Sequence, residues 1–161
     1  MTPFFNSSDR IATLDREART WLGTPFFPHS CAKGVGGGVD CVHLVQDILV
    51  ACGAMERQAL PSFPMDWADH RSESVVLGVF TQDRYFAEHF VALPFPETPA
   101  QPGDILCFKV GACVHHIGLM LPGQHFIHAL KPEGATILPL DVALAGQKLL
   151  GKIVRLYRPI S

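Results

Sequence analysis

The feature that most constrains this chain is the segment DCVHLVQDILVAC, residues 40–52, which places apolar side chains on nearly every side of a helix. A helix of this kind is stable only where neighbouring elements cover most of its surface. Asp40 can cap its first turn, and Gly53 suits the left-handed residue that follows a helix end. The segment therefore predicts a buried central helix against which the rest of the chain packs.

The chain before residue 100 is predicted to form helices joined by loops. Ser7 and Ser8 can cap a helix whose apolar stripe ends near Leu22. A long loop over residues 23–39 then ends in the glycine-rich run GVGGG. The remaining segments of this half are an irregular stretch and two weaker helical patterns, at residues 54–72, 74–80 and 82–92.

The chain after the proline-rich connector PFPETPAQPG, residues 94–103, is predicted to form short strands separated by turns. Residues 141–149 fit one or two helical turns. The predicted strands are 104–110, 113–121, 124–130, 135–139 and 151–158. Helices followed by an antiparallel meander of about five strands predict an α+β fold, in one domain that spans residues 1–161.

Length and composition exclude several classes of protein. With 161 residues, 48% apolar and 17% charged, the chain is too apolar and too weakly charged to be disordered. A net charge of −2 without a basic run argues against nucleic-acid binding, which relies on phosphate neutralisation. No run of eighteen apolar residues is present, so we expect no membrane span. The N-terminus lacks the basic and apolar regions of a secretory signal, so we expect a protein that is cytoplasmic when synthesised.

The cysteines point to one reactive thiol. Their number is five, which is odd, and their spacing is not that of a disulfide framework, so at least one is free. Cys41 follows the glycine-rich loop and begins the predicted buried helix, where unpaired amides and the helix dipole favour a thiolate. Cys52 is interpreted as a small buried apolar residue. No role is indicated for Cys31, Cys107 and Cys113.

A thiolate nucleophile needs an imidazole as general base or ion-pair partner. Four of the eight histidines fall in the predicted hairpin: His115, His116, His125 and His128. Neighbours on a strand point to opposite faces, so only one of His115 and His116 can face the Cys41 helix. A three-residue turn over 121–123 would place His116 directly across from His128, whereas a two-residue turn would place them on opposite faces.

The same residues admit other interpretations. GVGGG could be a phosphate-binding loop, but it follows no predicted strand and lacks the lysine of such loops. The four histidines with Cys107 and Cys113 could bind zinc, but no CxxC or HExxH spacing supports a site, and we expect no metal or other cofactor. Taken singly, a cysteine at a helix start is usually inert, and His115 and His125 fit structural roles.

Five sequence pieces follow one another along the chain: GTPFF (23–27), VGGGVDCVHLVQ (35–46), PGDILCF (102–108), HIGLML (116–121) and FIHA (126–129). In this combination the chain resembles the NlpC-type cell-wall cysteine peptidases, a papain-like α+β family. The longer loop CAKGVGGGVDC is most similar to the phage-tail and gene-transfer-agent members. That similarity implies proteins of a phage-tail-like particle as partners, and delivery to the cell wall with the particle.

The resemblance also implies roles for single residues. Cys41 becomes the nucleophile, His116 its base, and His128 the third polar residue, which orients the imidazole. The Cys41 backbone amide would contribute to an oxyanion hole. Members of the family typically cut the γ-D-glutamyl–diamino-acid bond of peptidoglycan stem peptides, some with a requirement for a free N-terminal L-Ala. The implied substrate-binding residues are Asp40, which is associated with holding that amine, Phe26, Gly38 and His115.

Two departures from the family pattern concern the same site. Phe26 stands where tyrosine is usual, and the missing hydroxyl predicts that stems with an acylated L-Ala are also cleaved. The common Asp-Cys-Ser-Gly is Asp-Cys-Val-His here, and His43 lies about 200° round a helix from Cys41, too far round to act readily as its base. Two other functions stay open: a non-catalytic structural module of a phage-tail-like particle, and a thiol amidase or acyltransferase of the same fold.

Overall fold

The computed structural model describes residues 1–60, 75–110, 113–145 and 151–161, and the side chains of 75–77, 79, 110, 113 and 115 lie outside the description. Most of the predicted irregular stretch, residues 61–72, therefore also lies outside it. None of the helices in the described part of the chain has the length and apolar composition that crossing a bilayer requires.

The first two helices begin at polar caps, as predicted. The Ser7 side chain accepts a hydrogen bond from the backbone N–H of Arg10, and Asp40 caps the next helix in the same way. Gly53 follows that helix with φ 72°, a left-handed conformation that glycine adopts without strain. The described helices are α1 (Ser8–Arg19), α2 (Cys41–Ala51), α4 (Val75–Gln82), α5 (Arg84–His89) and α6 (Leu140–Leu144).

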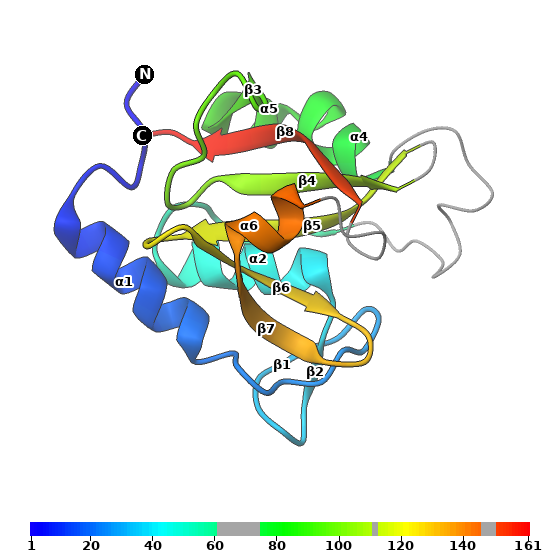
Figure 1. Ribbon diagram of the computed structural model, residues 1–161. Helices are drawn as coiled ribbons and strands as arrows, with labels where there is room; N and C mark the ends of the chain where they lie inside the picture. Colours follow the sequence, from blue (N-terminus) through cyan, green and yellow to red (C-terminus); the bar gives the residue numbers. More distant parts are fainter. Residues whose placement is uncertain (61–74, 111–112, 146–150) are drawn as a thin grey trace.

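The main sheet of the described chain has six antiparallel strands in the order β3-β8-β4-β5-β6-β7 (Figure 1). The strands from β4 to β7 form the predicted meander. The last strand, β8, does not extend it but returns to the other side of β4 and pairs there with β3. The strands are β3 (Phe90–Pro94), β4 (Ile105–Val110), β5 (Cys113–Leu121), β6 (His125–Leu130), β7 (Gly134–Pro139) and β8 (Lys152–Pro159). A small second sheet pairs β1 (Cys31–Ala32) with β2 (Gly38–Val39) in the glycine-rich loop.

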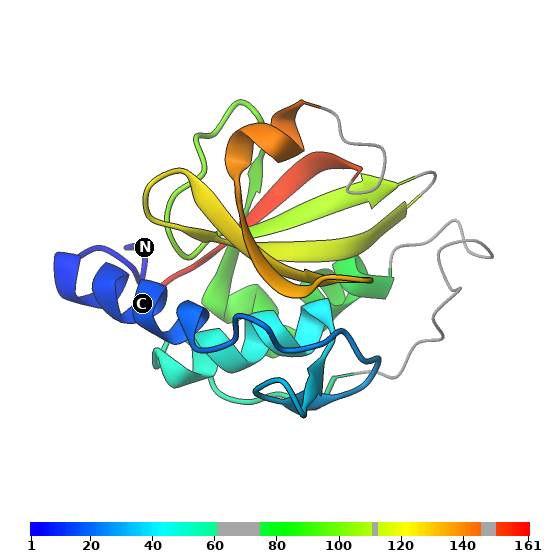
Figure 2. The same cartoon turned by 60° about the horizontal axis from the view of Figure 1, so that its bottom comes forward.

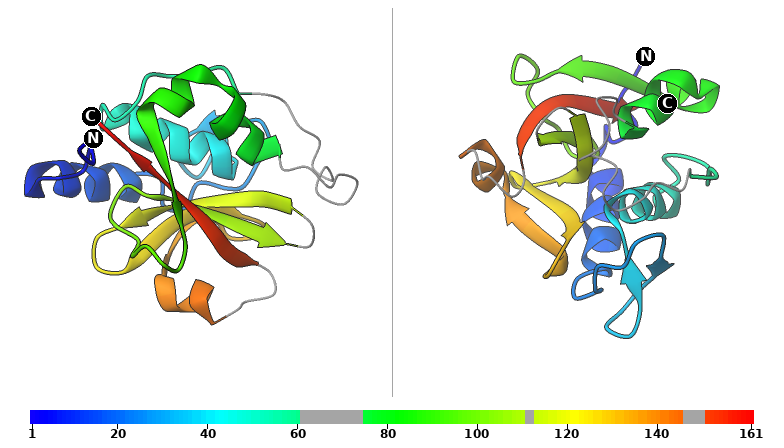
Figure 3. Two further views of the ribbon diagram at one scale, coloured as in Figure 1. Left: turned by 90° about the horizontal axis from the view of Figure 1, so that it is seen from above. Right: turned by 90° about the vertical axis from the view of Figure 1, so that its right-hand side faces the viewer.

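Both faces of the main sheet are apolar, because successive residues of its strands enter different cores. On β4, Cys107 packs into the core that includes α1 and α2, while Leu106 packs into a second core with residues of α6. Figure 3 shows α2, α4 and α5 on one face of the sheet and α6 on the other. Figure 2 shows α1 and α2 side by side along the first face. The buried central helix and the α+β class are therefore confirmed.

Three expectations about the elements were wrong. The main sheet has six strands rather than about five. Residues 90–92 were expected to end a helix but belong to β3, because pairing with β8 over five residues outweighs the local helical pattern. The strands β1 and β2 were not expected, since two residues carry no readable periodicity. Residues 140–144 confirm a short helix near the predicted 141–149, of which 146–149 lie outside the described residues.

A buried ion pair joins the two ends of the strand-rich half. Asp104, which is fully buried just before β4, accepts two hydrogen bonds of 2.7 Å from Arg158 of β8, one from Nε and one from Nη2. The same carboxylate accepts the backbone N–H of Gln101, and Arg158 also donates to the carbonyl of Pro99. This bidentate pair holds the last strand against the segment that leads into β4.

Replacing Arg158 by methionine should destabilise the protein by about 3–5 kcal/mol, because Asp104 would be left as a buried carboxylate without a countercharge. Urea unfolding measures this free energy. Lys152→Met, at an exposed position at the start of the same strand, is the matched control and should change stability by about 0.5 kcal/mol or less. Equal effects of the two variants would show that the ion pair does not hold β8 in place.

Candidate active site

The glycine-rich loop delivers the chain into the first turn of α2. Fully buried Thr24 anchors the loop, since its Oγ1 accepts the backbone N–H of Gly34 at 2.9 Å. The loop closes tightly on itself: a Cβ on Gly38 would lie 2.6 Å from the Cβ of Phe27. Gly38 is thus required by packing, and it stands two residues before Asp40. The substrate-binding role expected for Gly38 stays a prediction.

Cys41 is the first residue of α2 and is 9% exposed. Its sulfur lies at the backbone N–H of Ile117 on β5, and the N–H groups of Cys41 and Val42 also point toward it. Burial nevertheless raises the pKa of the Cys41 thiol to about 12, with the neighbouring Asp40 charge acting in the same direction. The expectation of a thiolate at rest was therefore wrong: desolvation outweighs the helix terminus. In this structure the thiol needs a base to become a nucleophile.

His116 and His128 form a hydrogen-bonded pair. Nε2 of His116 lies 2.9 Å from Nδ1 of His128, and both residues are less than 5% exposed. Of the two loop lengths that the sequence left open, the hairpin has the three-residue one, but it covers residues 122–124, since Leu121 pairs with His125. This register sets the two histidines diagonally on one face rather than directly opposite, a separation that ring side chains can bridge.

A β-bulge in β5 comes directly before His116. Phe108 pairs with His116 and Lys109 with Val114, which leaves His115 as the extra residue of the bulge. The His116 ring packs on Phe108, with their centroids 5.3 Å apart. Bulges of this kind re-aim side chains and are frequent beside active sites. The side chain of His115, expected to bind substrate, lies outside the described residues.

Burial keeps His128 in its neutral form. It lowers the pKa of His128 to about 4, against a small opposing effect of Glu133. A neutral His128 can accept a proton at Nδ1 from Nε2 of His116, and this tautomer puts the basic lone pair of His116 on Nδ1. The sulfur of Cys41 lies at the backbone N–H of Ile117, which follows His116 along β5. Such a set of groups can deprotonate a thiol and carry out acyl transfer.

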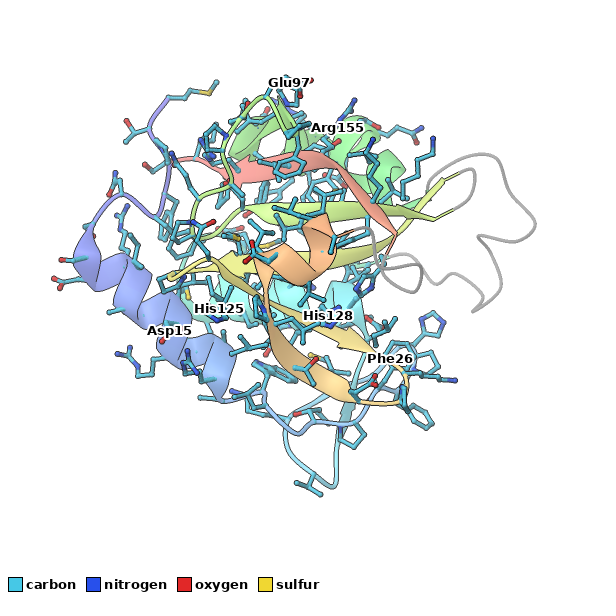
Figure 4. The ribbon with its side chains drawn as sticks, viewed as in Figure 1. Asp15, Phe26, Glu97, His125, His128 and Arg155 are labelled. Carbon is cyan, nitrogen blue, oxygen red and sulfur yellow. The ribbon has the colours of Figure 1, made fainter. Side chains whose placement is uncertain are left out.

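Figure 4 shows where two of the predicted site residues lie. His128 is on β6 where this strand contacts α2, and Phe26 lies near the β6–β7 turn. Phe26 is half-buried and forms a parallel β-bridge with Val39. The Nζ of Lys131 lies over the Phe26 ring, 5.7 Å from its centroid. Phe26 is therefore beside the strand that leads into Cys41, as a substrate-binding role would require.

His43 is the residue whose role the sequence analysis missed. Its Nδ1 lies 2.8 Å from both carboxylate oxygens of Asp40. Burial by itself would raise the pKa of Asp40, but its contacts with His43 and the backbone N–H of His29 outweigh this and lower it. The hydrogen bond and charge of Asp40 raise the pKa of His43 in turn. Its position three residues after the N-cap was the available signal, because side chains there reach back to the cap.

A metal site is not apparent at this position. Across the described residues, no group of three or more histidine, cysteine, aspartate or glutamate side chains is arranged to hold a metal ion. The described cysteines Cys31, Cys41, Cys52 and Cys107 are all free thiols.

Comparison with known proteins gives a family and a fold. The model of the NlpC/P60 family matches residues 23–154, which include α2 and the β5–β6 hairpin. No match was found among proteins with curated descriptions.

Solved structures share the fold at low sequence identity. NlpC1 from Trichomonas vaginalis is 15% identical, with 96% of this chain and 45% of that chain covered and a TM-score of 0.58. A lipoprotein-like NLP/P60 protein from Staphylococcus aureus is 20% identical, with 98% and 43% covered and a TM-score of 0.54. The peptidoglycan hydrolase RipB from Mycobacterium tuberculosis is 18% identical, with 85% and 61% covered and a TM-score of 0.50. This chain thus spans less than half of the first two structures and has their papain-like α+β fold.

The buried neutral His128 should make stability fall in mild acid. The unfolded chain takes up a proton on this residue near pH 6.5, whereas the folded chain resists until about pH 4, so stability is lost as the pH falls through this window. The loss amounts to about 3 kcal/mol. Between pH 7 and pH 4, the free energy of unfolding of the wild type should fall by about this amount more than that of His128→Asn. Parallel pH dependences would contradict a neutral buried His128.

Proposed function

The chain belongs to the NlpC/P60 family, and on that premise we propose that it is a cysteine peptidase that cleaves peptidoglycan stem peptides. The bond we assign is the one between γ-D-glutamate and the diamino acid. The observation that carries the proposal is the 2.9 Å contact between His116 and His128, together with the sulfur of Cys41 at the backbone N–H of Ile117, the residue after His116. RipB, a similar fold, is described as a peptidoglycan hydrolase, which supports the substrate class.

In the proposed reaction Cys41 Sγ attacks the carbonyl carbon of the scissile amide, and the thiol proton moves to Nδ1 of His116. Nδ1 is the acceptor because Nε2 contacts His128. The C–N bond then breaks as this proton passes to the departing nitrogen, which leaves the acyl group on sulfur as a thioester. Water attacks the thioester and gives a proton to His116, after which the acid and the thiol are released.

His128 acts here as a positioning residue. As the proton arrives on His116, a positive charge develops on a ring whose Nε2–H already has an acceptor. The neutral state of His128 matters because an imidazolium at this position would repel that charge. Burial of the pair keeps water from competing for the hydrogen bond.

A second candidate is a non-catalytic structural module of a phage-tail-like particle. The observation that favours it is the burial of Cys41, which raises the pKa of the thiol to about 12. Under this candidate the thiol stays protonated and the histidine pair only packs the sheet. Association with such a particle, and delivery from the cytoplasm to the cell wall, stay predictions under either function.

Cys41→Ser and His116→Ala should each lower the cleavage of purified muropeptides by at least about 1,000-fold, because the thiol and its base act as one unit. His128→Asn should be milder, about 10- to 100-fold, since asparagine can still accept from His116. Mass spectrometry of the products identifies the bond. Circular dichroism checks that each variant folds.

Cys52→Ser is the matched control, since this half-buried cysteine lies at the other end of the same helix. It should keep wild-type activity. Undiminished cleavage by Cys41→Ser, or no cleavage of any stem by the wild type, would favour the structural module.

A further inference from the structure

The Asp40 carboxylate beside the nucleophile is fully engaged within the protein. Oδ1 accepts the backbone N–H of His43 at 2.8 Å, and Oδ2 accepts the backbone N–H of His29 at 2.8 Å. The His43 ring lies 2.8 Å from both oxygens. Asp40 is 8% exposed, so few positions remain from which a substrate group could reach it.

The charges around His43 show that its ion-pair partner is Asp40 rather than Asp47. Among the described residues, charges on Asp40, Asp47 and Arg57 act on its ring. Asp47, one turn further along α2, is paired with Arg57, and both lie near the exposed thiol of Cys31. The Asp47 and Arg57 charges therefore compensate each other, whereas His43 is the cation that faces Asp40.

We propose that His43 is the built-in counter-ion of Asp40, so that the Asp40–His43 pair beside Cys41 carries no net charge. The site then accepts substrates in which the amine is N-acylated, and thus neutral, rather than substrates with a free ammonium group. The charge compensation depends only on the geometry, while the substrate class rests on the proposed function. A bare carboxylate at this position would attract a cation, whereas an ion pair has a field that falls off steeply. An incoming ammonium would also meet the imidazolium of His43.

The compensation depends on pH in a defined direction. Asp40 raises the pKa of His43, so the imidazolium persists to a higher pH than that of an unpaired histidine. As the pH rises above the pKa of His43, the imidazolium loses its proton and Asp40 is left with an uncompensated charge. Selection of cations at Cys41 should therefore increase with pH.

Two thiol reagents of equal shape measure the charge beside Cys41 without any substrate. One is a trimethylammonium-ethyl methanethiosulfonate and the other its neutral tert-butyl-ethyl counterpart. The ratio of their rates at Cys41, followed by peptide mapping, cancels the thiolate fraction. His43→Gln should raise the cationic-to-neutral ratio about three- to tenfold at neutral pH. The wild-type ratio should rise with pH, whereas that of His43→Gln should stay constant.

Three controls separate charge from packing. Asp40→Asn keeps a side chain suited to the N-cap, and in this background His43→Gln should leave the ratio unchanged. His89→Gln removes a ring that lies against Tyr85, whose backbone carbonyl is 2.8 Å from Nδ1 of His89, and should also have no effect. Titration of His43 by NMR tests the pair even if Cys41 is too buried to react: its pKa should fall in Asp40→Asn. An unchanged pKa, or equal reagent ratios in wild type and His43→Gln, overturns the proposal.

A peptide experiment extends the test to the substrate. The wild type should cleave N-acetylated L-Ala-γ-D-Glu-diaminopimelate at least as well as the free-amine peptide, and His43→Gln should shift kcat/KM about three- to tenfold toward the free amine. Cleavage of neither peptide, with the reagent ratios as expected, would reject the proposed function but keep the counter-ion. A strong wild-type preference for the free amine would overturn the assigned substrate class.

Discussion

The packing of the first turn of α2 against β5 is the contact on which the candidate site depends. It brings the sulfur of Cys41 to the backbone N–H of Ile117, one residue from His116. The apolar sides of α2 are what hold it there, since Leu44, Ile48 and Leu49 are fully buried between α1 and the sheet. Burial of these side chains supplies most of the stability of the contact, because a short helix is marginal on its own.

Burial shifts the pKa values of two groups at the candidate site, Cys41 and His128. It raises the pKa of the Cys41 thiol and lowers that of His128, in each case because a charge is costly away from water. At rest the Cys41 thiol and the His128 ring are therefore both uncharged. The contact with His128 occupies Nε2 of His116 and leaves its Nδ1 as the basic nitrogen of the proposed reaction. In the proposed reaction, charge develops only when His116 takes the proton from the sulfur as it attacks the substrate.

Asp40 shows how one residue can serve structure and chemistry together. As the N-cap it satisfies amides that the first turn of α2 would leave without partners. Its charge would oppose a thiolate on the next residue, and His43 compensates it from within the same turn. Local chain geometry thus supplies both the cap and its counter-ion, without a contribution from the sheet.

The sequence by itself determined the features that depend on neighbours along the chain. The buried helix, its Asp40 cap and the strands of the meander were predictable, because periodicity and capping are local properties, whereas the length of the hairpin loop was left open. The NlpC/P60 motifs were also readable from their order. Only the tertiary structure decided the rest: β8 pairs between β3 and β4, a bulge at His115 interrupts the pairing of β5 with β4, and burial raises the pKa of the Cys41 thiol. Those outcomes depend on groups far apart in sequence, whose contacts and burial no local pattern specifies.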